Sequence, residues 1–214
     1  MLVPVLATAI VAYFAGSIPT GYLVARARGL DIRSIGSGNI GATNVFRILG
    51  KPAGIFVLLV DALKGFLGCM AWEWLAPSSF GTAETVRHAE VLRIVGSMGA
   101  IMGHNYTCWL RFKGGKGIAT SAGALIGLLP VPFLIVLAIW LFLLGATRYV
   151  SLASIGAAVA LPFATWLGGR TRLLIGVTIV MSALAVYKHR ANIRRLLDGT
   201  ENRVGKSKKE GAPV

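Results

Sequence analysis

Acidic residues are scarce in this sequence, and charged residues of any kind are few. Asp and Glu together number 8 against 22 Lys and Arg, and charged residues make up 14% of the 214 positions, whereas a soluble domain carries roughly 25%. Hydrophobic residues make up 55%, and the mean hydropathy is +0.71. This composition excludes an ordinary soluble domain and predicts a chain embedded in a membrane. The formal net charge of +14 lies mainly in short connections and the tail, which favours anionic lipid or an anionic substrate over nucleic acid as partner.

Cysteine and histidine are also few, with 2 and 3 copies. Cys69 and Cys108 lie in apolar segments, where they fit packing positions, and they have the spacing of neither a metal site nor a disulfide framework. The histidines are widely separated, so we expect no metal and no other cofactor. The N-terminus lacks the basic region and the small-residue cleavage site of a signal peptide, so its apolar stretch is expected to remain as a helix.

Apolar segments of membrane-spanning length alternate with short polar connections. Leu2 to Ala25 is long enough to cross a hydrocarbon core of ~30 Å, although Ser17-Ile-Pro-Thr-Gly21 is expected to bend its second half. Further spans are predicted at 54–76 and 91–110, and breaks rich in Gly, Pro or Arg divide residues 118–188 into four more apolar pieces. The predicted count is therefore seven. Five is the fallback, because the first of these four pieces is only about 18 Å long as a helix.

Basic residues predict the orientation of the spans. The polar connection at 26–52 has five Lys or Arg and one acid, and the chain from Lys188 onward has eight against three acids. Both are expected in the cytoplasm, with the N-terminus and the connection at 77–90 outside. The sequence thus predicts an all-α, polytopic membrane helical bundle, with a single domain over residues 1–203 and a basic polar tail over residues 204–214.

A cationic, glycine-rich stretch, Phe112 to Thr120, lies between two of these apolar segments. It combines three glycines and two lysines, at Gly114, Gly115, Gly117, Lys113 and Lys116. Glycine allows positive φ and close approach of backbone N–H groups, and a helix predicted to begin at Ile118 would point its own N–H groups at the same anion. The combination favours a phosphate. The alternative is that the lysines only hold a loop on the cytoplasmic face.

Polar side chains and glycines also fill residues 36–47 of the first connection. The hydroxyls and amides are Ser37, Asn39, Thr43 and Asn44. The stretch ends on Arg47, whose guanidinium suits bidentate binding of an oxyanion. The alternative is a turn and a helix cap, which Ser and Asn commonly supply.

A third polar stretch, residues 188–201, follows the last predicted span. A helix that continued out of that span would place His189, Asn192 and Arg195 roughly on one face, so that a histidine would lie beside an amide and a cation. The alternative is that His189 only caps carbonyls at a helix end or lies at the membrane interface. All three polar stretches are expected on the same side of the membrane, which favours a shared site.

Two charged residues fall inside a predicted span. Asp61 and Lys64 are three apart, and charge within a membrane is costly, so the simplest interpretation is a mutual ion pair that faces the bundle interior. Their predicted role is structural. The alternative for Lys64 is a contact with a phosphate, which requires a site recessed into the bundle.

Three separated motifs carry a family resemblance. They are Ser37-Gly-Asn-Ile-Gly-Ala-Thr-Asn44 with Arg47; Gly103-His-Asn with Phe112-Lys-Gly-Gly-Lys-Gly-Ile-Ala-Thr120; and Lys188-His-Arg-x-Asn-Ile-x-Arg-Leu-Leu-x-Gly-Thr-Glu201. In this order they resemble the signature motifs of the bacterial acyl-phosphate:glycerol-3-phosphate acyltransferases, the PlsY family. Residues 17–21 and 61–65 are also similar to the first two spans of that family. The loop at 77–90 and the tail after Arg203 are not covered by the resemblance.

The resemblance implies a seven-helix enzyme in the plasma or inner membrane of a bacterium, with its active site facing the cytoplasm. It would transfer a fatty acyl group from acyl phosphate to the 1-hydroxyl of glycerol 3-phosphate, giving lysophosphatidic acid and phosphate for phospholipid biosynthesis. The implied catalytic residues are Ser37, Arg47, His189 and Asn192. The implied substrate-binding residues are Asn39, Thr43, Asn44, His104, Lys113, Gly114, Gly115, Lys116 and Gly117. Glu201 matches a position needed mainly for integrity. The expected partners are the two substrates and anionic membrane lipid, with no obligate protein partner.

The chemistry is consistent with these residue types. Acyl phosphate is a mixed anhydride with a good leaving group, so orientation and charge stabilisation matter more than a strong nucleophile. The proton of the glycerol hydroxyl could pass to His189 or to a phosphate oxygen of the donor, and we favour the donor because the sequence offers no carboxylate set to orient the histidine.

Several alternative classes lack support in the sequence. The His-x4-Asp pair of the soluble and CoA-dependent glycerolipid acyltransferases is absent, and the glycine-rich stretch does not match a Walker loop. The competing class is a transporter or carrier for a phosphorylated solute. It would predict a two-fold internal repeat, which we do not find.

Overall fold

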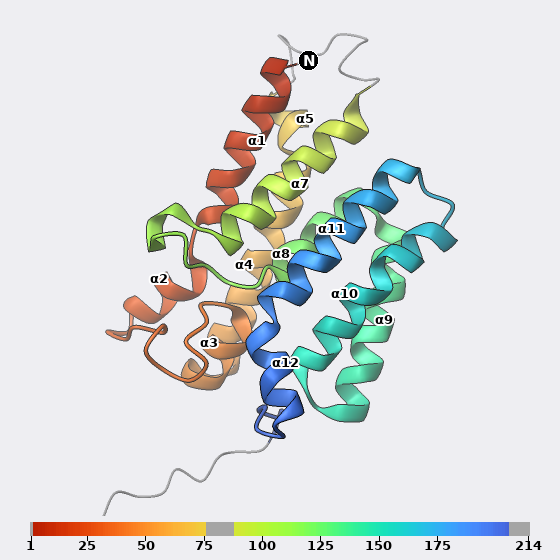
Figure 1. Ribbon diagram of the computed structural model, residues 1–214. Helices are drawn as coiled ribbons and strands as arrows, with labels where there is room; N and C mark the ends of the chain where they lie inside the picture. Colours follow the sequence, from red (N-terminus) through yellow and green to blue (C-terminus); the bar gives the residue numbers. More distant parts are fainter. Residues whose placement is uncertain (1, 76–87, 206–214) are drawn as a thin grey trace, which may run out of the picture. The chain divides into compact units, whose positions relative to one another are not determined.

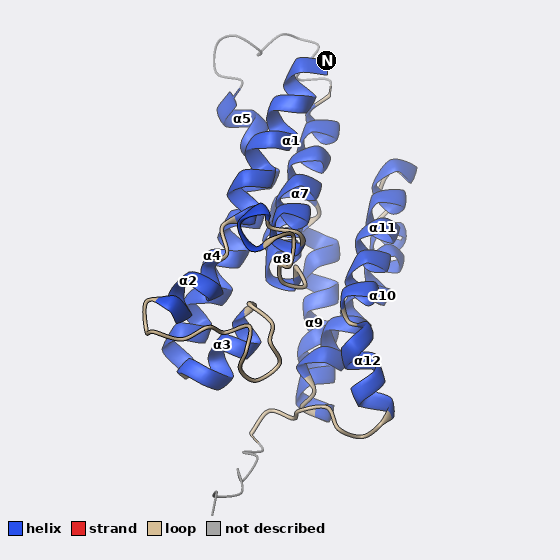
Figure 2. Cartoon of the chain, turned by 60° about the vertical axis from the view of Figure 1, so that its left-hand side comes forward, coloured by secondary structure: helices blue, strands red, loops and turns tan. Residues whose placement is uncertain are grey.

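The computed structural model describes residues 2–75 and 88–205, and every regular element in these ranges is a helix (Figure 1, Figure 2). The elements are α1 (Leu2–Ser17), α2 (Thr20–Arg26), α3 (Ala42–Leu49), α4 (Lys51–Cys69), α5 (Ala71–Leu75), α7 (Ala89–Asn105), the 3-10 helix η1 (Cys108–Leu110), α8 (Ile118–Leu128), α9 (Pro130–Thr147), α10 (Val150–Leu167), α11 (Arg172–Lys188) and α12 (Arg190–Leu197). The predicted all-α class is therefore confirmed. The predicted connection at 77–90 and tail at 204–214 lie almost entirely outside the described residues.

Four helical segments are long and apolar enough to cross a membrane: Leu2–Arg26, Lys51–Cys69, Pro130–Thr147 and Val150–Leu167. A fifth is reached if α11 and α12, which are bent by 57° relative to each other, form one span. Seven spans and the orientation of the termini stay predictions. Helices α7 and α8 have 17 and 11 residues, which corresponds to about 25 and 16 Å, less than the ~30 Å of a hydrocarbon core. Large side chains exposed on α1 and α4, such as Phe14 and Phe56, fit contact with lipid.

The chain divides into two compact units, residues 1–133 and 134–214. In the first unit α1 packs along α7, and α4 packs along α8 (Figure 1). Glycines make both contacts close: a Cβ on Gly103 would lie 2.1 Å from the Tyr13 carbonyl oxygen, and one on Gly123 only 1.7 Å from a main-chain oxygen of α4. Backbones can approach this closely only where there is no side chain, as in the small-residue contacts of membrane helices.

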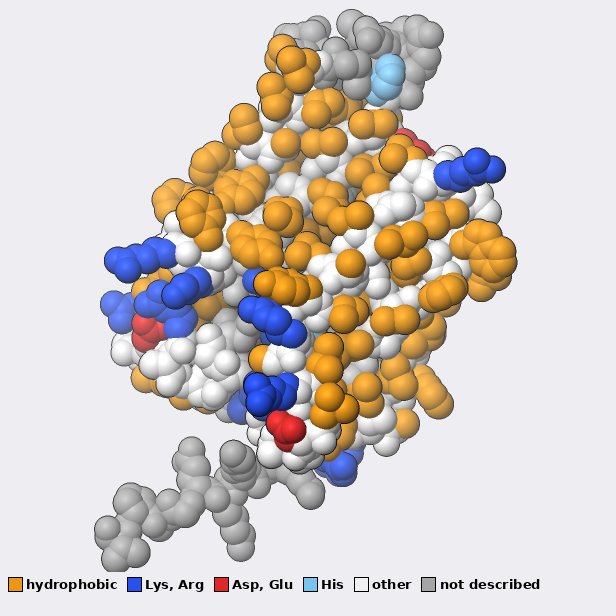
Figure 3. All heavy atoms as spheres, in the orientation of Figure 1, with side chains coloured by type: hydrophobic (Ala, Val, Ile, Leu, Met, Phe, Trp, Pro, Cys, Tyr) orange, Lys and Arg blue, Asp and Glu red, His pale blue; other side chains and the backbone are white. Residues whose placement is uncertain are grey.

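The predicted bend in the first apolar stretch is confirmed by a break between α1 and α2. Ser17 ends α1 and Thr20 begins α2, so Ile18 and Pro19 belong to neither helix. Pro19 has no N–H to continue the hydrogen-bond ladder, and carbonyl groups at the end of α1 therefore need other partners. Thr107 supplies one of them, because its hydroxyl donates to the Ser17 carbonyl oxygen. Within this unit, Lys and Arg side chains gather around α2 while hydrophobic side chains cover α1 (Figure 3).

The first polar connection contains the helix α3, which the sequence analysis does not predict. α3 packs against α4, and Val45 is fully buried. Val45 belongs to a hydrophobic cluster whose other buried members are Ala25, Ile32, Ile40, Ala53, Val57 and Leu110. The cluster draws on α2, the loop after it, α3, α4 and η1. The polar residues 36–47 therefore stand on a hydrophobic support rather than in an open loop.

In the second unit α10 and α11 lie side by side, and α12 follows α11 directly (Figure 1). Residues 190–197 are helical, as considered from the sequence, but they form a separate helix because the chain bends by 57° at His189. The ring of His189 bonds to the carbonyl oxygen of Ala185 (Nδ1···O 2.8 Å). The main-chain N–H of His189 donates to the same oxygen at 3.1 Å, so the ring and the last turn of α11 share this acceptor.

Candidate active site

Asn44 closes the loop of the first polar stretch from inside. Its side chain is only 2% exposed. Its Oδ1 accepts the N–H of Ser37 at 3.0 Å, and its Nδ2 donates to the carbonyl oxygens of Ile32 and Ile35 at 3.3 and 3.1 Å. The hydrogen bonds of Asn44 therefore hold the shape of the loop.

Other polar side chains of this stretch face outward. Ser37, Thr43 and Arg47 are exposed. Thr43 and Arg47 are four residues apart in α3, so they lie on the same face of that helix. Asn39 accepts the N–H of Gly41 through Oδ1 at 2.9 Å, which leads the chain into α3. The stretch thus presents two hydroxyls and a guanidinium to a ligand.

The single acid of the first connection is neutralised locally. Arg33 donates to both carboxylate oxygens of Asp31, from Nε at 2.9 Å and from Nη2 at 2.7 Å. These hydrogen bonds, together with the N–H of Arg33 and its positive charge, lower the pKa of Asp31 to about 2. Asp31 stays ionised at neutral pH and compensates Arg33. Residues 26–52 contain no second acid that could neutralise the charge of Arg47.

The glycine-rich stretch lies against the end of α7. The N–H of Gly115 donates to the His104 carbonyl oxygen at 3.0 Å, and the N–H of Gly114 donates to that of Asn105 at 3.3 Å. Of the two properties expected of these glycines, positive φ is used by Gly117 alone among the three, with φ of 78°. The other two are required for closeness: a Cβ on Gly114 would lie 2.0 Å from the His104 carbonyl oxygen.

The start of α8 supplies the anion-binding geometry that the sequence predicts. α8 begins at Ile118, as expected, directly after Gly117 in the left-handed conformation. The first-turn N–H groups of a helix have no acceptor within the helix and carry the positive end of its dipole. Lys113 is exposed and Lys116 is partly buried. The cationic cradle therefore consists of a helix N-terminus and two lysines, while two of the glycine N–H groups serve the fold.

A left-handed turn delivers this stretch. Arg111 and Phe112 both have positive φ, 54° and 60°, a conformation that costs non-glycine residues energy and is found at functional sites. The N–H of Phe112 donates to the Thr107 carbonyl oxygen at 2.9 Å, which helps to hold the turn. Leu110, just before it, is buried in the cluster that supports α3. The structure therefore brings the first and second polar stretches together in one unit.

The predicted pair of charges inside α4 is confirmed. Lys64 Nζ lies 2.8 Å from Asp61 Oδ1, and both side chains are buried. His104, from α7, is also buried, at 4% exposure, and its Nδ1 lies 3.7 Å from the same carboxylate oxygen. The sequence analysis places His104 among the substrate-binding residues and does not link it to Asp61.

The third polar stretch belongs to the second unit, where His189 and Asn192 are buried. A carbonyl oxygen can only accept a hydrogen bond, so the contact with Ala185 places the proton of a neutral His189 ring on Nδ1 and leaves Nε2 as the acceptor nitrogen. The sequence offers no carboxylate set to orient this histidine. The orienting group is a main-chain carbonyl, which no residue-type pattern reveals.

Glu201 joins α10 to α12 within the second unit. Its Oε1 accepts from Ser151 Oγ at 3.0 Å and from Asn192 Nδ2 at 2.8 Å, and its Oε2 accepts from Arg195 Nε at 2.7 Å. Burial acts to raise the pKa of Glu201, but the hydrogen bonds from Asn192, Arg195 and Ser151 and the charge of Arg195 outweigh it and hold the pKa below its usual value. Ser151 is a supporting residue that the sequence analysis does not single out.

The described residues were also compared with the ligand sets that hold metal ions in proteins. Within residues 2–75 and 88–205, no group of three or more His, Cys, Asp or Glu side chains could hold a metal ion.

Apolar helices of spanning length define the class as an integral membrane protein, and the cationic glycine-rich loop at the start of α8 is its candidate site. A model of the family described as glycerol-3-phosphate acyltransferase matches residues 6–199. The glycerol-3-phosphate acyltransferase of Geotalea daltonii is 50% identical over 191 residues, covering 89% of this chain and 93% of the relative. That of Geobacter sulfurreducens is 47% identical over 193 residues, with 90% and 94% covered. The chain belongs to the glycerol-3-phosphate acyltransferase family.

Solved structures support this assignment. The crystal structure of PlsY (YgiH), an integral membrane glycerol 3-phosphate acyltransferase in its glycerol 3-phosphate form, matches with a TM-score of 0.83 and 38% identity, covering 94% of this chain and 96% of that one. Its lysophosphatidic acid form matches with a TM-score of 0.80 and 37% identity, covering 94% and 95%.

Proposed function

We propose that this protein transfers a fatty acyl group from acyl phosphate to the 1-hydroxyl of glycerol 3-phosphate, forming lysophosphatidic acid and inorganic phosphate. The observation that carries the proposal is the glycine-rich stretch, which lies against α7, starts α8 and presents Lys113 and Lys116 beside a helix N-terminus. This arrangement suits a phosphate monoester. The names of the family and of the related structures support glycerol 3-phosphate as the acceptor.

The reaction needs little covalent chemistry from the protein. The 1-hydroxyl oxygen attacks the acyl carbon, an ester C–O bond forms, the bond between the acyl carbon and the phosphate oxygen breaks, and phosphate leaves with the electron pair. Both substrates are phosphate anions that repel each other, so cations in a partly dehydrated site lower the barrier most. The chain supplies them in Arg47, Lys113 and Lys116.

Each polar stretch has a proposed role. Lys113, Lys116 and the residues from Gly114 to Gly117 bind the phosphate of glycerol 3-phosphate. Ser37, Arg47 and their neighbours Asn39 and Thr43 hold the phosphate of the donor, with Asn44 keeping their loop in shape.

His189 and Asn192 orient the acceptor hydroxyl. The proton passes to a phosphate oxygen of the donor, as we favour from the sequence.

The proposed setting is a bacterial plasma or inner membrane. Seven crossings, an outer N-terminus and a cytoplasmic active site follow from the distribution of Lys and Arg in the connections. The same basic residues would bind anionic lipid head groups.

The test uses the purified protein in sealed lipid vesicles with acyl phosphate and labelled glycerol 3-phosphate. We expect labelled lysophosphatidic acid with acyl phosphate as donor, and none with an acyl-CoA thioester. Labelled glycerol 3-phosphate that enters the vesicles without forming product would instead support a carrier and would overturn the proposal.

One variant tests whether the glycine-rich loop binds glycerol 3-phosphate. Lys116→Ala is expected to raise the KM for glycerol 3-phosphate by about tenfold or more, which corresponds to ~1.4 kcal/mol of lost binding, while Lys51→Ala, an exposed lysine at the start of α4, leaves the KM unchanged. An unchanged KM in Lys116→Ala would remove the loop from the site.

A further inference from the structure

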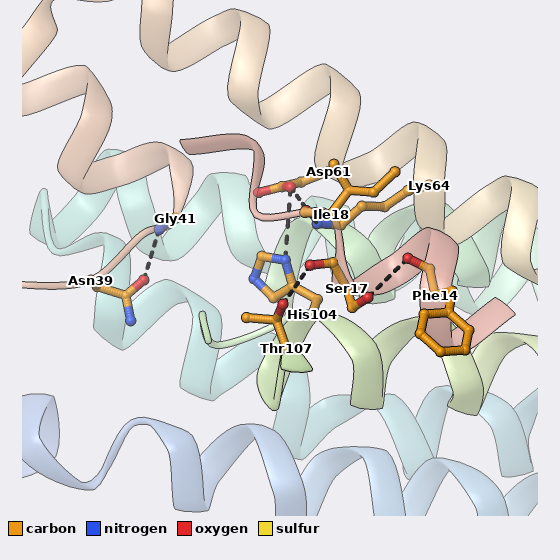
Figure 4. Close-up of polar contacts among 9 residues, drawn as sticks. All are labelled: Phe14, Ser17, Ile18, Asn39, Gly41, Asp61, Lys64, His104 and Thr107. Atoms are coloured by element: carbon orange, nitrogen blue, oxygen red, sulfur yellow. Dashed lines mark hydrogen bonds and ion pairs between the residues drawn. The ribbon is translucent and has the colours of Figure 1, made fainter. Parts of the chain in front are cut away.

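A buried charge pair lies beside the glycine-rich loop in the first unit. Asp61 and Lys64 are 2% and 7% exposed at their side chains, and their charged atoms are 2.8 Å apart (Figure 4). Asp61 is ten residues into α4, or about 15 Å along the helix. A buried ion pair is often no more stable than an apolar pair of the same volume. Its presence here calls for a role other than stability.

Lys64 fixes the pair to the break between α1 and α2. Its Nζ donates to the carbonyl oxygen of Ile18 at 2.9 Å. The N–H of Thr20 donates to the same oxygen at 3.0 Å. This carbonyl lies outside the helical ladder because of Pro19, so the ammonium meets an acceptor whose position the break determines. Asp61 is thereby held by a lysine that is itself held by the backbone.

His104 lies between Asp61 and the loop. Its Nδ1 is 3.7 Å from Asp61 Oδ1, which is beyond hydrogen-bond length, so this contact is electrostatic (Figure 4). The other ring nitrogen faces the loop: a Cβ on Gly115 would lie 2.1 Å from His104 Nε2. The main-chain oxygen of His104 also accepts the N–H of Gly115 at 3.0 Å. A shift of the His104 ring towards the loop would therefore displace Gly115, and a shift away from the loop would remove the support behind it.

We propose that Asp61 and His104 are positioning residues: the Asp61–Lys64 pair, anchored on the Ile18 carbonyl, fixes the His104 ring, and the ring fixes the glycine-rich loop at Gly115. The expected effect on the KM for glycerol 3-phosphate rests on the proposed function. It gives Asp61 and Lys64 more than the structural role expected from the sequence. In this inference His104 does not contact the substrate itself but holds the loop that does, which agrees with its 4% exposure.

The test separates stability from position. Asp61→Asn alone strands the buried Lys64 charge, so it lowers the Tm whether or not the residue positions anything. The double variant Asp61→Asn/Lys64→Met removes both charges and is expected to recover most of the Tm. The KM for glycerol 3-phosphate should nevertheless stay raised by about tenfold, because displacing a binding group by about 1 Å has effects of this order or larger, while kcat at saturation changes less than about threefold. A double variant with the KM of the wild type would overturn the inference.

A matched control removes another helix-to-helix ion pair from the same unit. Arg93 of α7 donates from Nε and Nη2 to Glu73 of α5. Arg93 lies near the start of α7 and His104 at its end, about 16 Å apart along the helix, so Glu73→Gln/Arg93→Met should leave the KM for glycerol 3-phosphate unchanged. An equal rise in KM in this control would show that any lost ion pair loosens the unit, and the inference would fail.

A spectroscopic readout keeps the inference independent of the activity. A nitroxide at Phe112→Cys, an exposed position with no proposed role in binding, with Cys69 and Cys108 replaced by alanine, reports the loop without removing a residue of the site. Its mobility should rise in Asp61→Asn/Lys64→Met and stay constant in the Glu73/Arg93 control. If the wild type makes no lysophosphatidic acid but the mobility of the label rises as expected, the proposed function fails and the positioning role stands. If the wild type is active but the mobility of the label is the same in wild type and double variant, the positioning role fails. Where the double variant is not recovered folded, His104→Gln tests the same link with the same two outcomes.

Discussion

Glu201→Gln is expected to destabilise the second unit through one lost ion pair. The carboxylate accepts hydrogen bonds from Ser151, Asn192 and Arg195, and its side chain is 7% exposed. The amide keeps one acceptor for Ser151 and Asn192 but turns an N–H₂ group towards Arg195. Hydrogen bonds to charged groups contribute about 1.5–3 kcal/mol, and Arg195 is about one-third exposed, so the expected loss is ~2 kcal/mol.

The expected change in Tm follows from this loss. For a chain of this size each kcal/mol corresponds to about 2–4 °C, so Glu201→Gln should melt ~4–8 °C lower in detergent or lipid nanodiscs. Glu201→Ala should melt lower still, because Asn192 Nδ2 and Ser151 Oγ then lose their acceptor as well. Asp198→Asn is the matched control, since Asp198 is exposed at the end of α12 and its amide variant should keep the Tm of the wild type.

The pH dependence gives the refuting result. The pKa of Glu201 is lowered in the folded protein, so the unfolded chain binds this proton more readily than the folded chain does. The contribution to stability is complete above the usual pKa of 4.5 and is lost as the pH falls through the lowered value. The gap in Tm between the wild type and Glu201→Gln should therefore narrow below pH 4.5. A gap that is absent at pH 7, or that widens on acidification, would refute the assignment of the network.

Two further variants test contacts with the main chain in the first unit, each against a control in the second unit. Gly114→Ala places a Cβ 2.0 Å from a main-chain oxygen of α7, so the loop must move by more than 1 Å and the KM for glycerol 3-phosphate should rise about 10- to 100-fold; Gly145→Ala, with open space around its Cβ, should leave it unchanged. Thr107→Val removes the buried donor to the Ser17 carbonyl and should cost about 1–3 kcal/mol of unfolding free energy, whereas Thr165→Val removes only a bond to a carbonyl of its own helix and should cost less. Equal KM values in the first pair, or equal Tm values in the second, would contradict the respective contact.

Local chemistry explains the parts of the fold that the sequence predicts. Pro19 lacks an N–H, which is enough to place the break after α1, and Gly117 followed by an apolar run is enough to place the start of α8. α3 was not predictable in this way. Its buried Val45 packs against Ala25 and Leu110, which are distant in sequence, and only those contacts make an eight-residue helix stable.

The bend at His189 has no signature in residue types, and neither has the hydrogen bond between the His189 ring and the Ala185 carbonyl oxygen.

The site shows the same division between local and distant contacts. The Asp61–Lys64 pair is predictable because three residues in a helix bring the side chains together. The position of His104 is not, because it depends on how α7 packs beside α4. Likewise, the hydroxyl that Ser151 gives to Glu201 comes from 50 residues away and has no special sequence context. Motif resemblance indicates which residues matter, and packing decides which of them meet the ligand and which hold their neighbours.

The shortness of α8 has a consequence for where water and lipid meet. The helix has 11 residues, or about 16 Å from end to end, roughly half the thickness of a hydrocarbon core. When one end lies at a membrane surface, the other end lies near mid-depth, or the bilayer thins around it. A hydrophilic phosphate ester that avoids hydrocarbon and a fatty chain that avoids water, the two proposed substrates, then have a common depth at which to react. The protein would bring the aqueous phase down to the lipid instead of lifting the chain out of it.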